Sequence, residues 1–125
     1  MTIEKKKVVA VLSDLMFTVK IQEAALRAGV EVVFVKSLAA TLEQAKGHPA
    51  AILIDLNDST AQPLEIIAAL KEDAQTAEIG LVGFVSHVQA ELIHAAREKG
   101  CETVMARSAF SQNLTAILQR YANQA

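Results

Sequence analysis

The chain has 125 residues, of which 52% are hydrophobic and 21% charged, so it can build the core of one domain and is not disordered throughout. Its net charge is −2, from 12 Lys and Arg against 14 Asp and Glu, which argues against nucleic-acid binding, because such proteins usually carry a basic excess. The single cysteine suits a reducing compartment, and no apolar stretch approaches the ~20 residues of a membrane helix. A cytoplasmic protein without membrane or nucleic-acid partners is therefore expected.

Five short apolar runs rich in β-branched residues alternate with segments of helical period. The expected strands are 8–12, 30–35, 50–54, 81–85 and 103–105. The expected helices are about 15–28, a segment from a Ser37 cap to about 46, a segment from Gln62-Pro63 through 70, the segment 88–96, and a segment from a Ser111 cap through 121. Gly29, Gly47 and Gly100 stand where helices commonly end in a left-handed glycine. This alternation predicts one α/β domain over residues 1–125, with a flavodoxin-like parallel sheet of order 2-1-3-4-5.

Polar residues follow the carboxyl end of each expected strand. They are Ser13, Asp14, Lys36, Ser37, Asp55, Asn57, Asp58, Ser86, His87, Arg107 and Ser108. In open α/β sheets ligands bind beyond these strand ends, where the strand order reverses, which here lies between the first and third strands. The alternative is structural, because strand ends lead into loops and loops are commonly polar.

Asp55 ends the expected central strand, and Asp14 follows the strand beside it. Two carboxylates at neighbouring strand ends repel each other unless a cation or a proton neutralises them. Mg²⁺ is a cation that oxygen ligands hold well. Ser86 can donate a hydrogen bond to an oxyanion, and Arg107 supplies a fixed positive charge. These residue types favour a phosphoryl-acceptor site. In the alternative, Asp14 caps the first helix, Asp55 caps a turn, and Arg107 neutralises both.

The order of these residues resembles the receiver (CheY-like) domain of bacterial two-component response regulators, over essentially the whole chain. Ile54-Asp55-Leu56-Asn57 resembles the strand end that carries the phosphorylated aspartate, and Phe84-Val85-Ser86-His87 resembles the strand end with the hydroxyl residue. The segment 100–108 resembles the closing motif, which in the family ends in Lys-Pro. Asp14, Asp55 and Arg107 stand at spacings close to those of the family.

The resemblance implies a stand-alone signalling domain that accepts a phosphoryl group on Asp55 and then changes its binding to a partner. It implies Mg²⁺ held by Asp14, Asp55 and the backbone carbonyl of Asn57; phosphate contacts from Ser86 and Arg107; and further pocket positions at Ser13, His87 and Ser108. The implied partners are a sensor histidine kinase or other phosphodonor and a downstream protein. Any enzymatic activity is at most autophosphorylation and autodephosphorylation at Asp55. No output domain is expected within this length.

The sequence also departs from the family pattern. Receivers usually place two acids after the first strand, whereas here the pair is Ser13-Asp14, and either residue can fill the metal-ligand position. Arg107 and Ser108 replace Lys-Pro, and Val104 stands where the family has a switch aromatic. These changes favour an alternative, a pseudo-receiver that binds proteins and is not phosphorylated. A weaker alternative is a small anion-binding flavodoxin-like domain that uses Arg107, Ser108, Ser86 and Lys36.

Leu15-Met16-Phe17 follows the acid at a place where receivers are commonly more polar. These residues either start the core face of the first helix or form an apolar lip that excludes solvent or contacts a partner.

Overall fold

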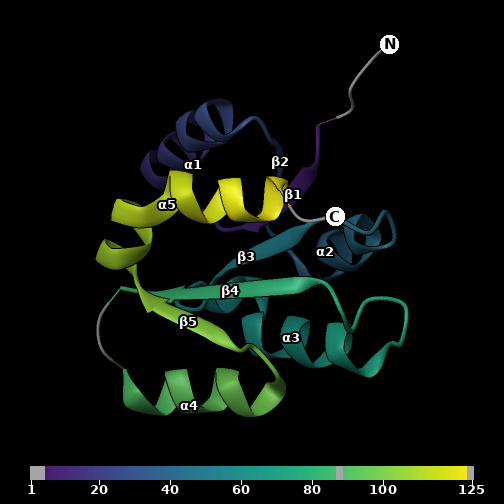
Figure 1. The fold of residues 1–125 in the computed structure, drawn as a ribbon. Helices are drawn as coiled ribbons and strands as arrows, with labels where there is room; N and C mark the ends of the chain where they lie inside the picture. The colour runs from purple at the N-terminus through teal and green to yellow at the C-terminus, as the bar shows by residue number, and fades with distance from the viewer. Residues whose placement is uncertain (1–4, 87–88, 124–125) are drawn as a thin grey trace.

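The computed structural model describes residues 5–86 and 89–123 and contains a five-stranded parallel sheet (Figure 1). The strands are β1 (Lys7–Val11), β2 (Glu31–Val35), β3 (Ala51–Asp55), β4 (Gly80–Val85) and β5 (Thr103–Ala106). Their order is β2-β1-β3-β4-β5, so the predicted flavodoxin-like topology is confirmed. β1 and β3 are adjacent, and the strand order reverses between them. The polar residues that follow these two strands therefore reach the same edge of the sheet.

Helices cover both faces of the sheet. They are α1 (Leu15–Ala28), α2 (Leu38–Ala45), α3 (Pro63–Glu72), α4 (Ala90–Lys99) and α5 (Arg107–Ala122), with a short 3₁₀ turn η1 (Ser59–Ala61) before α3. α1 and α5 lie side by side on one face, and α2, α3 and α4 lie on the other (Figure 1). Within the described ranges, the helices all fall short of the length and hydropathy that crossing a bilayer demands.

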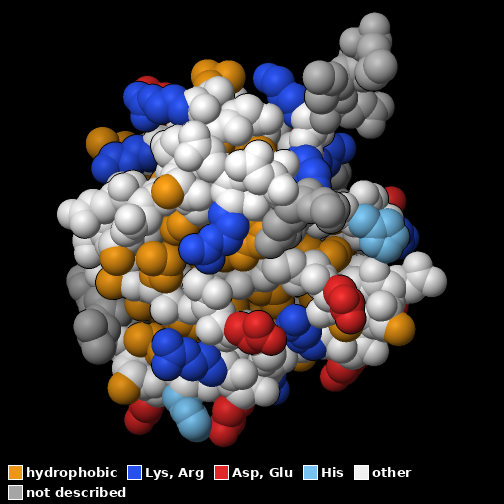
Figure 2. Space-filling model, viewed as in Figure 1, with side chains coloured by type: hydrophobic (Ala, Val, Ile, Leu, Met, Phe, Trp, Pro, Cys, Tyr) orange, Lys and Arg blue, Asp and Glu red, His pale blue; other side chains and the backbone are white. Residues whose placement is uncertain are grey.

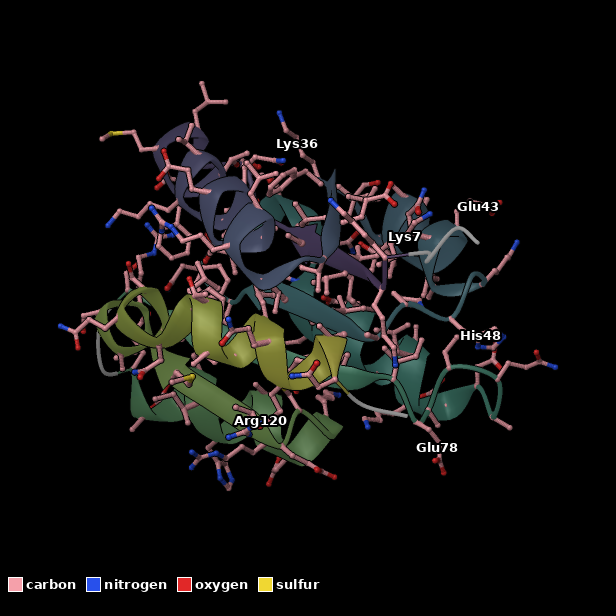
Figure 3. All side chains as sticks on the ribbon, turned by 45° about the horizontal axis from the view of Figure 1, so that its top comes forward. Lys7, Lys36, Glu43, His48, Glu78 and Arg120 are labelled. Carbon is pink, nitrogen blue, oxygen red and sulfur yellow. The ribbon has the colours of Figure 1, made fainter. Side chains whose placement is uncertain are left out.

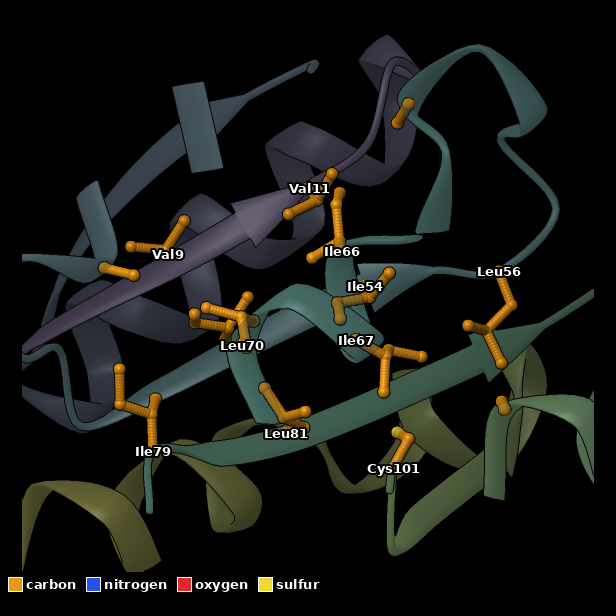
Figure 4. Packing of buried hydrophobic residues seen from close by; sticks show 14 of the residues in the cluster. Val9, Val11, Ile54, Leu56, Ile66, Ile67, Leu70, Ile79, Leu81 and Cys101 are labelled. Atoms are coloured by element: carbon orange, nitrogen blue, oxygen red, sulfur yellow. The ribbon is translucent and has the colours of Figure 1, made fainter. Parts of the chain in front are cut away.

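The sheet separates two apolar layers. Val9, Val11 and Ile54 lie on the α3 side of the sheet, where Ile66, Ile67 and Leu70 pack with them (Figure 4). The alternate strand residues, among them Val8, Leu53 and Phe84, point toward α1 and α5. Because β3 is buried on both faces, its sequence is a continuous apolar run that ends at Asp55.

Several predicted helix ends are confirmed. The Asp14 side chain caps α1 by accepting a hydrogen bond from Phe17 N, and Ser37 caps α2 in the same way through Ala40 N. Gly29 and Gly100 end α1 and α4 with φ of 75° and 116°, a region that glycine enters without steric cost.

Two predicted helix ends are wrong. α5 begins at Arg107, directly after β5, and Ser111 lies inside the helix instead of capping it. Gly47 does not take the left-handed conformation after α2; the neighbouring His48 does, with φ of 54°. Val88, which was expected in α4, lies outside the described residues.

Candidate functional site

The side chains after β1, β3 and β5 meet at the carboxyl edge of the sheet. Val11 and Ile54 pair in register, so that Asp14 and Asp55 emerge from neighbouring strand ends. Arg107 opens α5 immediately after β5 and lies between the two acids. The predicted convergence of one guanidinium and two carboxylates is therefore present in the structure.

Arg107 bridges both acids. Its Nη1 donates to Asp14 Oδ2 over 3.0 Å, and its Nη2 donates to Asp55 Oδ2 over 3.2 Å. The side chain of Asp55 is only 8% exposed, that of Arg107 is 27% exposed and that of Asp14 is 38% exposed. A guanidinium has a planar fork of donors, so one side chain can satisfy two separate carboxylates at once. The charge that two neighbouring acids need is thus supplied from within the chain.

An aromatic platform holds the guanidinium in place. The Arg107 guanidinium carbon lies 4.6 Å from the ring centre of Phe17 and 5.7 Å from that of Phe84. Phe84 in turn stacks on Phe110, with ring centres 4.6 Å apart. The Nε–H of Arg107 is buried and finds no hydrogen-bond acceptor among the described residues. The position of Arg107 therefore depends on the cation–π contacts and the two ion pairs.

Asp55 and Asn57 form a turn at the end of β3. Asp55 Oδ1 accepts a hydrogen bond from Asn57 N over 3.0 Å. The Asn57 side chain accepts from Ser86 N over 2.7 Å through Oδ1 and donates through Nδ2 to Gln89. It thereby ties the end of β3 to both sides of the connection between β4 and α4.

Ser13 contacts a third acid, different from the two that Arg107 holds. Its hydroxyl donates to Asp58 Oδ2 over 2.7 Å, and the Thr60 hydroxyl donates to Asp58 Oδ1 over 2.6 Å. Asp58 is therefore engaged with two hydroxyl groups at the rim of the site.

As these side chains lie, they do not fit the Mg²⁺ site that the resemblance implies. Both carboxylate oxygens of Asp14 and of Asp55 already accept hydrogen bonds, and the backbone carbonyl of Asn57 accepts one from Ser59 N. In the described part of the chain, no group of three or more His, Cys, Asp and Glu side chains is placed to hold a metal ion. The guanidinium lies between the two carboxylates, in the position that a shared cation would need.

The acids at this edge differ in their ionisation. Burial raises the pKa of Asp55 above its ordinary value of 3.8, and the Asn57 N–H and the Arg107 charge oppose this shift only in part. The Phe17 N–H and the Arg107 side chain lower the pKa of Asp14. The Thr60 hydroxyl, and then that of Ser13, lowers the pKa of Asp58. Among the three acids, only Asp55 has a pKa that burial raises above the ordinary value.

The predicted phosphate-contact residues share an open hollow beside Arg107. Ser86, Arg107 and Ser108 line this hollow of about 470 Å³ together with Phe17, Lys20, Ser111 and Gln112. Lys36 is exposed and points away from the domain, so it is not brought to the site (Figure 3). His87 lies outside the described residues. The roles assigned to these residues stay predictions.

Sequence reasoning missed the contacts that hold the charged groups in place. Phe17 and Phe84 form the platform under Arg107, and Gln89 contacts Asn57. The position of Phe17, three residues after the Asp14 cap, gave a signal, because it places the ring on the same side of α1 as the acid. The sequence gives no such signal for Phe84. A buried phenylalanine in a strand has the same sequence pattern whether its ring contacts an apolar side chain or a guanidinium.

We expect Asp14→Ala to lower the free energy of unfolding by about 1 kcal/mol, because it removes the α1 cap as well as one ion pair. Asp14→Asn keeps a cap of similar quality, so its smaller cost reports the carboxylate charge alone. The pKa of Asp14 is lowered in the folded state, so this charge-dependent part is present above pH 3.8 and is lost as the pH falls through the folded pKa. Thermal unfolding of both variants between acid and neutral pH measures it. A difference between wild type and Asp14→Asn that persists in strong acid would contradict the ion-pair assignment.

No protein-family model matches the sequence, and no curated protein matches it. Solved structures do match. The response regulator from Hahella chejuensis is 18% identical, with a TM-score of 0.84, and the match covers 95% of this chain and 96% of that one. The phosphorylated cyanobacterial phytochrome response regulator RcpA is 22% identical, with a TM-score of 0.78 over 94% of this chain and 91% of that one. The fold is that of the response-regulator receiver domain.

A third structure with the receiver fold contains a metal ion. The receiver domain of sensor histidine kinase PA1611 from Pseudomonas aeruginosa is 14% identical, with a TM-score of 0.81 over 97% of this chain and all of that one. Its structure has a magnesium ion coordinated in the active-site cleft. In the present chain Arg107 lies between the two acids at the carboxyl edge of the sheet. The receiver fold is thus combined here with a guanidinium bridge.

Proposed function

We propose that this chain is a protein-interaction module with the receiver fold, in which Arg107 neutralises the Asp14 and Asp55 carboxylates and Asp55 does not turn over phosphate. The observation that carries this proposal is the guanidinium bridge, with contacts of 3.0 and 3.2 Å to the two acids. A carboxylate that attacks phosphorus must be accessible, and the Asp55 side chain is 8% exposed, with one oxygen paired with Arg107 and the other with the Asn57 N–H. In this proposal, any signalling by the domain depends on which protein binds it.

Receivers usually carry two adjacent acids after the first strand, whereas this chain has Ser13 beside Asp14. The missing second acid also supports the proposal. Ser13 stands beside Asp14 and its hydroxyl is turned to Asp58. A serine hydroxyl adds no negative charge, so the site has less to offer a divalent cation than a pair of adjacent acids would. The inference that Asp55 does not turn over phosphate therefore rests on which residues are present as well as on how they are arranged.

Phosphoryl acceptance at Asp55 is the second candidate. Its support is the position of Asp55 at the end of the central strand, beside a hollow lined by Ser86 and Arg107. It requires Arg107 to release the carboxylate and rotate toward the incoming phosphoryl oxygens. A sensor histidine kinase or another phosphodonor would then act upstream, and a downstream protein would read the change.

One experiment separates the two candidates. Amide NMR spectra are recorded for wild type and Asp55→Asn with Mg²⁺ and beryllofluoride, and intact masses after incubation with Mg²⁺ and a small phosphodonor. The proposal expects no saturable shift near positions 55 and 86 and no added phosphoryl mass in either protein. A phosphorylatable receiver domain in the same buffer is the positive control. Shifts or added mass in wild type that Asp55→Asn abolishes would overturn the proposal in favour of phosphoryl acceptance.

A further inference from the structure

The open hollow beside Arg107 is lined by donor groups from two helices. Lys20 reaches it from α1, and Ser108 and Ser111 reach it from α5. Among the described residues that line this hollow, none carries a carboxylate. Its volume of about 470 Å³ falls in the range of ~300–1,000 Å³ that is usual for the sites of small ligands. A hollow with this lining suits an anionic ligand.

Lys20 brings an unpaired positive charge to the hollow. Its side chain crosses from α1 toward α5, where Nζ donates to Ser111 Oγ over 3.4 Å. In the part of the chain that the structure describes, no carboxylate lies within ion-pair distance of this ammonium, whereas the Arg107 guanidinium is held by two acids. Figure 2 shows basic side chains over α1, while most acidic side chains on that face of the molecule lie in its lower half. An anion in the hollow supplies the partner that Lys20 lacks.

The first turn of α5 adds donors that no side chain caps. Ala106 holds the cap position and has no hydrogen-bonding side chain. The first N–H groups of a helix have no partner within it and carry a partial positive charge. Ser108 and Ser111 are three residues apart, so their hydroxyl groups lie on one face of α5, toward the hollow. The helix start, two hydroxyls and one ammonium thus converge on the same space.

We propose that this hollow binds the phosphate group of a small phosphate monoester, without forming a covalent bond to it. The donors are Lys20 Nζ, the hydroxyls of Ser108 and Ser111, and the first N–H groups of α5. A phosphate offers three acceptor oxygens and up to two negative charges, so it can meet donors from both helices at once, whereas a carboxylate has only two oxygens. The volume is many times the ~30 Å³ of a water molecule, which leaves room for the organic part of the ester.

The proposed site is separate from the chemistry at Asp55. Arg107 lines the hollow, but its two Nη groups already donate to carboxylates, so it is not counted among the donors. Phe17 packs against Arg107 and is the buried member of the expected lip, whereas Leu15 and Met16 are exposed and do not line the hollow. The proposal therefore stands whether or not Asp55 accepts a phosphoryl group.

The exposure of the donors sets the expected affinity. The side chains of Lys20 and Ser108 are exposed, so water and salt screen their attraction for an anion. We expect a dissociation constant on the order of 1 mM at low salt, which increases as salt is added.

A titration followed by amide NMR tests the site. Glycerol 2-phosphate is added to the full chain at slightly alkaline pH, with sodium chloride keeping the ionic strength constant. Saturable shifts are expected for the amides of Ser108 and Ser111. Lys20→Met should raise the dissociation constant about tenfold, because it removes a charged donor, and Lys20→Glu should abolish binding. Lys36→Met is the matched control and should leave the constant unchanged, since Lys36 is also exposed but points away from the domain (Figure 3).

Inorganic phosphate is titrated in parallel to distinguish the two sources of a phosphate group. Binding of the ester at least as tight as that of the free ion supports the proposal, whereas tighter binding of the free ion overturns the assignment to an ester. Shifts that grow without saturation, or an equal loss of affinity in Lys20→Met and Lys36→Met, would show that the hollow is not a specific site.

Circular dichroism confirms that each variant is folded, which is expected because both lysines are exposed. The titration contains neither Mg²⁺ nor a phosphodonor and is read on α5. Its failure is therefore distinguishable from the outcome of the experiment at Asp55.

Discussion

Arg107→Met is expected to lower the free energy of unfolding by about 2 kcal/mol. The methionine keeps an unbranched apolar chain at this position, but it removes the guanidinium that lies over Phe17 and leaves the buried Asp55 carboxylate without its cationic partner. Removing one partner of a fully buried pair costs ~3–5 kcal/mol, and the partial exposure of Arg107 and Asp14 reduces this value. Arg107→Lys retains the charge and should cost less, and Arg120→Met on the exposed last turn of α5 is the matched control. Urea denaturation at neutral pH measures all three.

The same variant tests whether the guanidinium stands in for a divalent cation. With the arginine removed, Asp14 and Asp55 repel each other, and Mg²⁺ commonly binds through one or two carboxylates and several waters. Mg²⁺ should therefore raise the Tm of Arg107→Met and leave the Tm of wild type unchanged, because a ligand that binds only the native state stabilises it. If Mg²⁺ stabilises wild type equally, Arg107 does not block the cation and the phosphoryl-acceptor candidate is favoured.

The topology could be predicted from the sequence because the composition of the strands and the residues at the helix ends indicate the same alternation of strands and helices. Continuous apolar runs that contain β-branched residues, such as 51–54, are typical of strands covered on both faces. Asp14, Ser37 and Gly29 carry capping chemistry that acts locally. Right-handed crossovers then leave few topologies, and among these the order 2-1-3-4-5 is a common one for five strands. The convergence of Asp14 and Asp55 was predictable for the same reason, since adjacent strand ends share one edge of the sheet.

The start of α5 could not be predicted because no side chain marks it. Ala106 occupies the cap position and has no hydrogen-bonding group, whereas Ser111 is a good capping residue that lies one turn inside the helix. Ser13 posed a similar problem, because its hydroxyl could face either the expected metal or Asp58 and only the fold of the β3–α3 loop decides between them. The contact of Ser13 with Asp58 joins residues far apart in the sequence, so no local pattern indicates it.

The engagement of Arg107 was among the alternatives that the sequence left open. Arginine at this position could point to the two acids, to a bound anion or to solvent. The rings of Phe17 and Phe84 pack against the guanidinium, and neither contact was predicted from the sequence. The role of Arg107 is therefore a property of the core beneath it.

Phe84→Ala is expected to be the most damaging substitution at this edge, lowering the free energy of unfolding by about 4 kcal/mol. Phe84 is fully buried, stacks on Phe110, and lies 5.2 Å from Phe17 between ring centres. Alanine leaves a cavity bounded by two rings that cannot both move into it, because α1 and α5 fix their positions. Phe84→Leu fills most of the space and should cost about 1.5 kcal/mol, the upper range for hydrophobic swaps of similar volume. Urea midpoints for both variants provide the comparison.

Substitution of Phe84 should also weaken the Arg107 bridge to the two acids, because the guanidinium of Arg107 packs against the Phe84 ring. Phe84→Leu remains well packed but has a smaller aromatic platform, so the Arg107 bridge to the two acids is weaker. Mg²⁺ should therefore raise the Tm of this variant, as it raises the Tm of Arg107→Met. The matched variant Phe34→Leu alters a ring packed against the same layer from β2, at the far side of β1 from the acids, and should stay insensitive to Mg²⁺. Equal Mg²⁺ responses in the two leucine variants would mean that the aromatic platform does not hold Arg107 on the acids. A response confined to Phe84→Leu would instead show that the cation preference of this edge is set by an uncharged side chain beneath it.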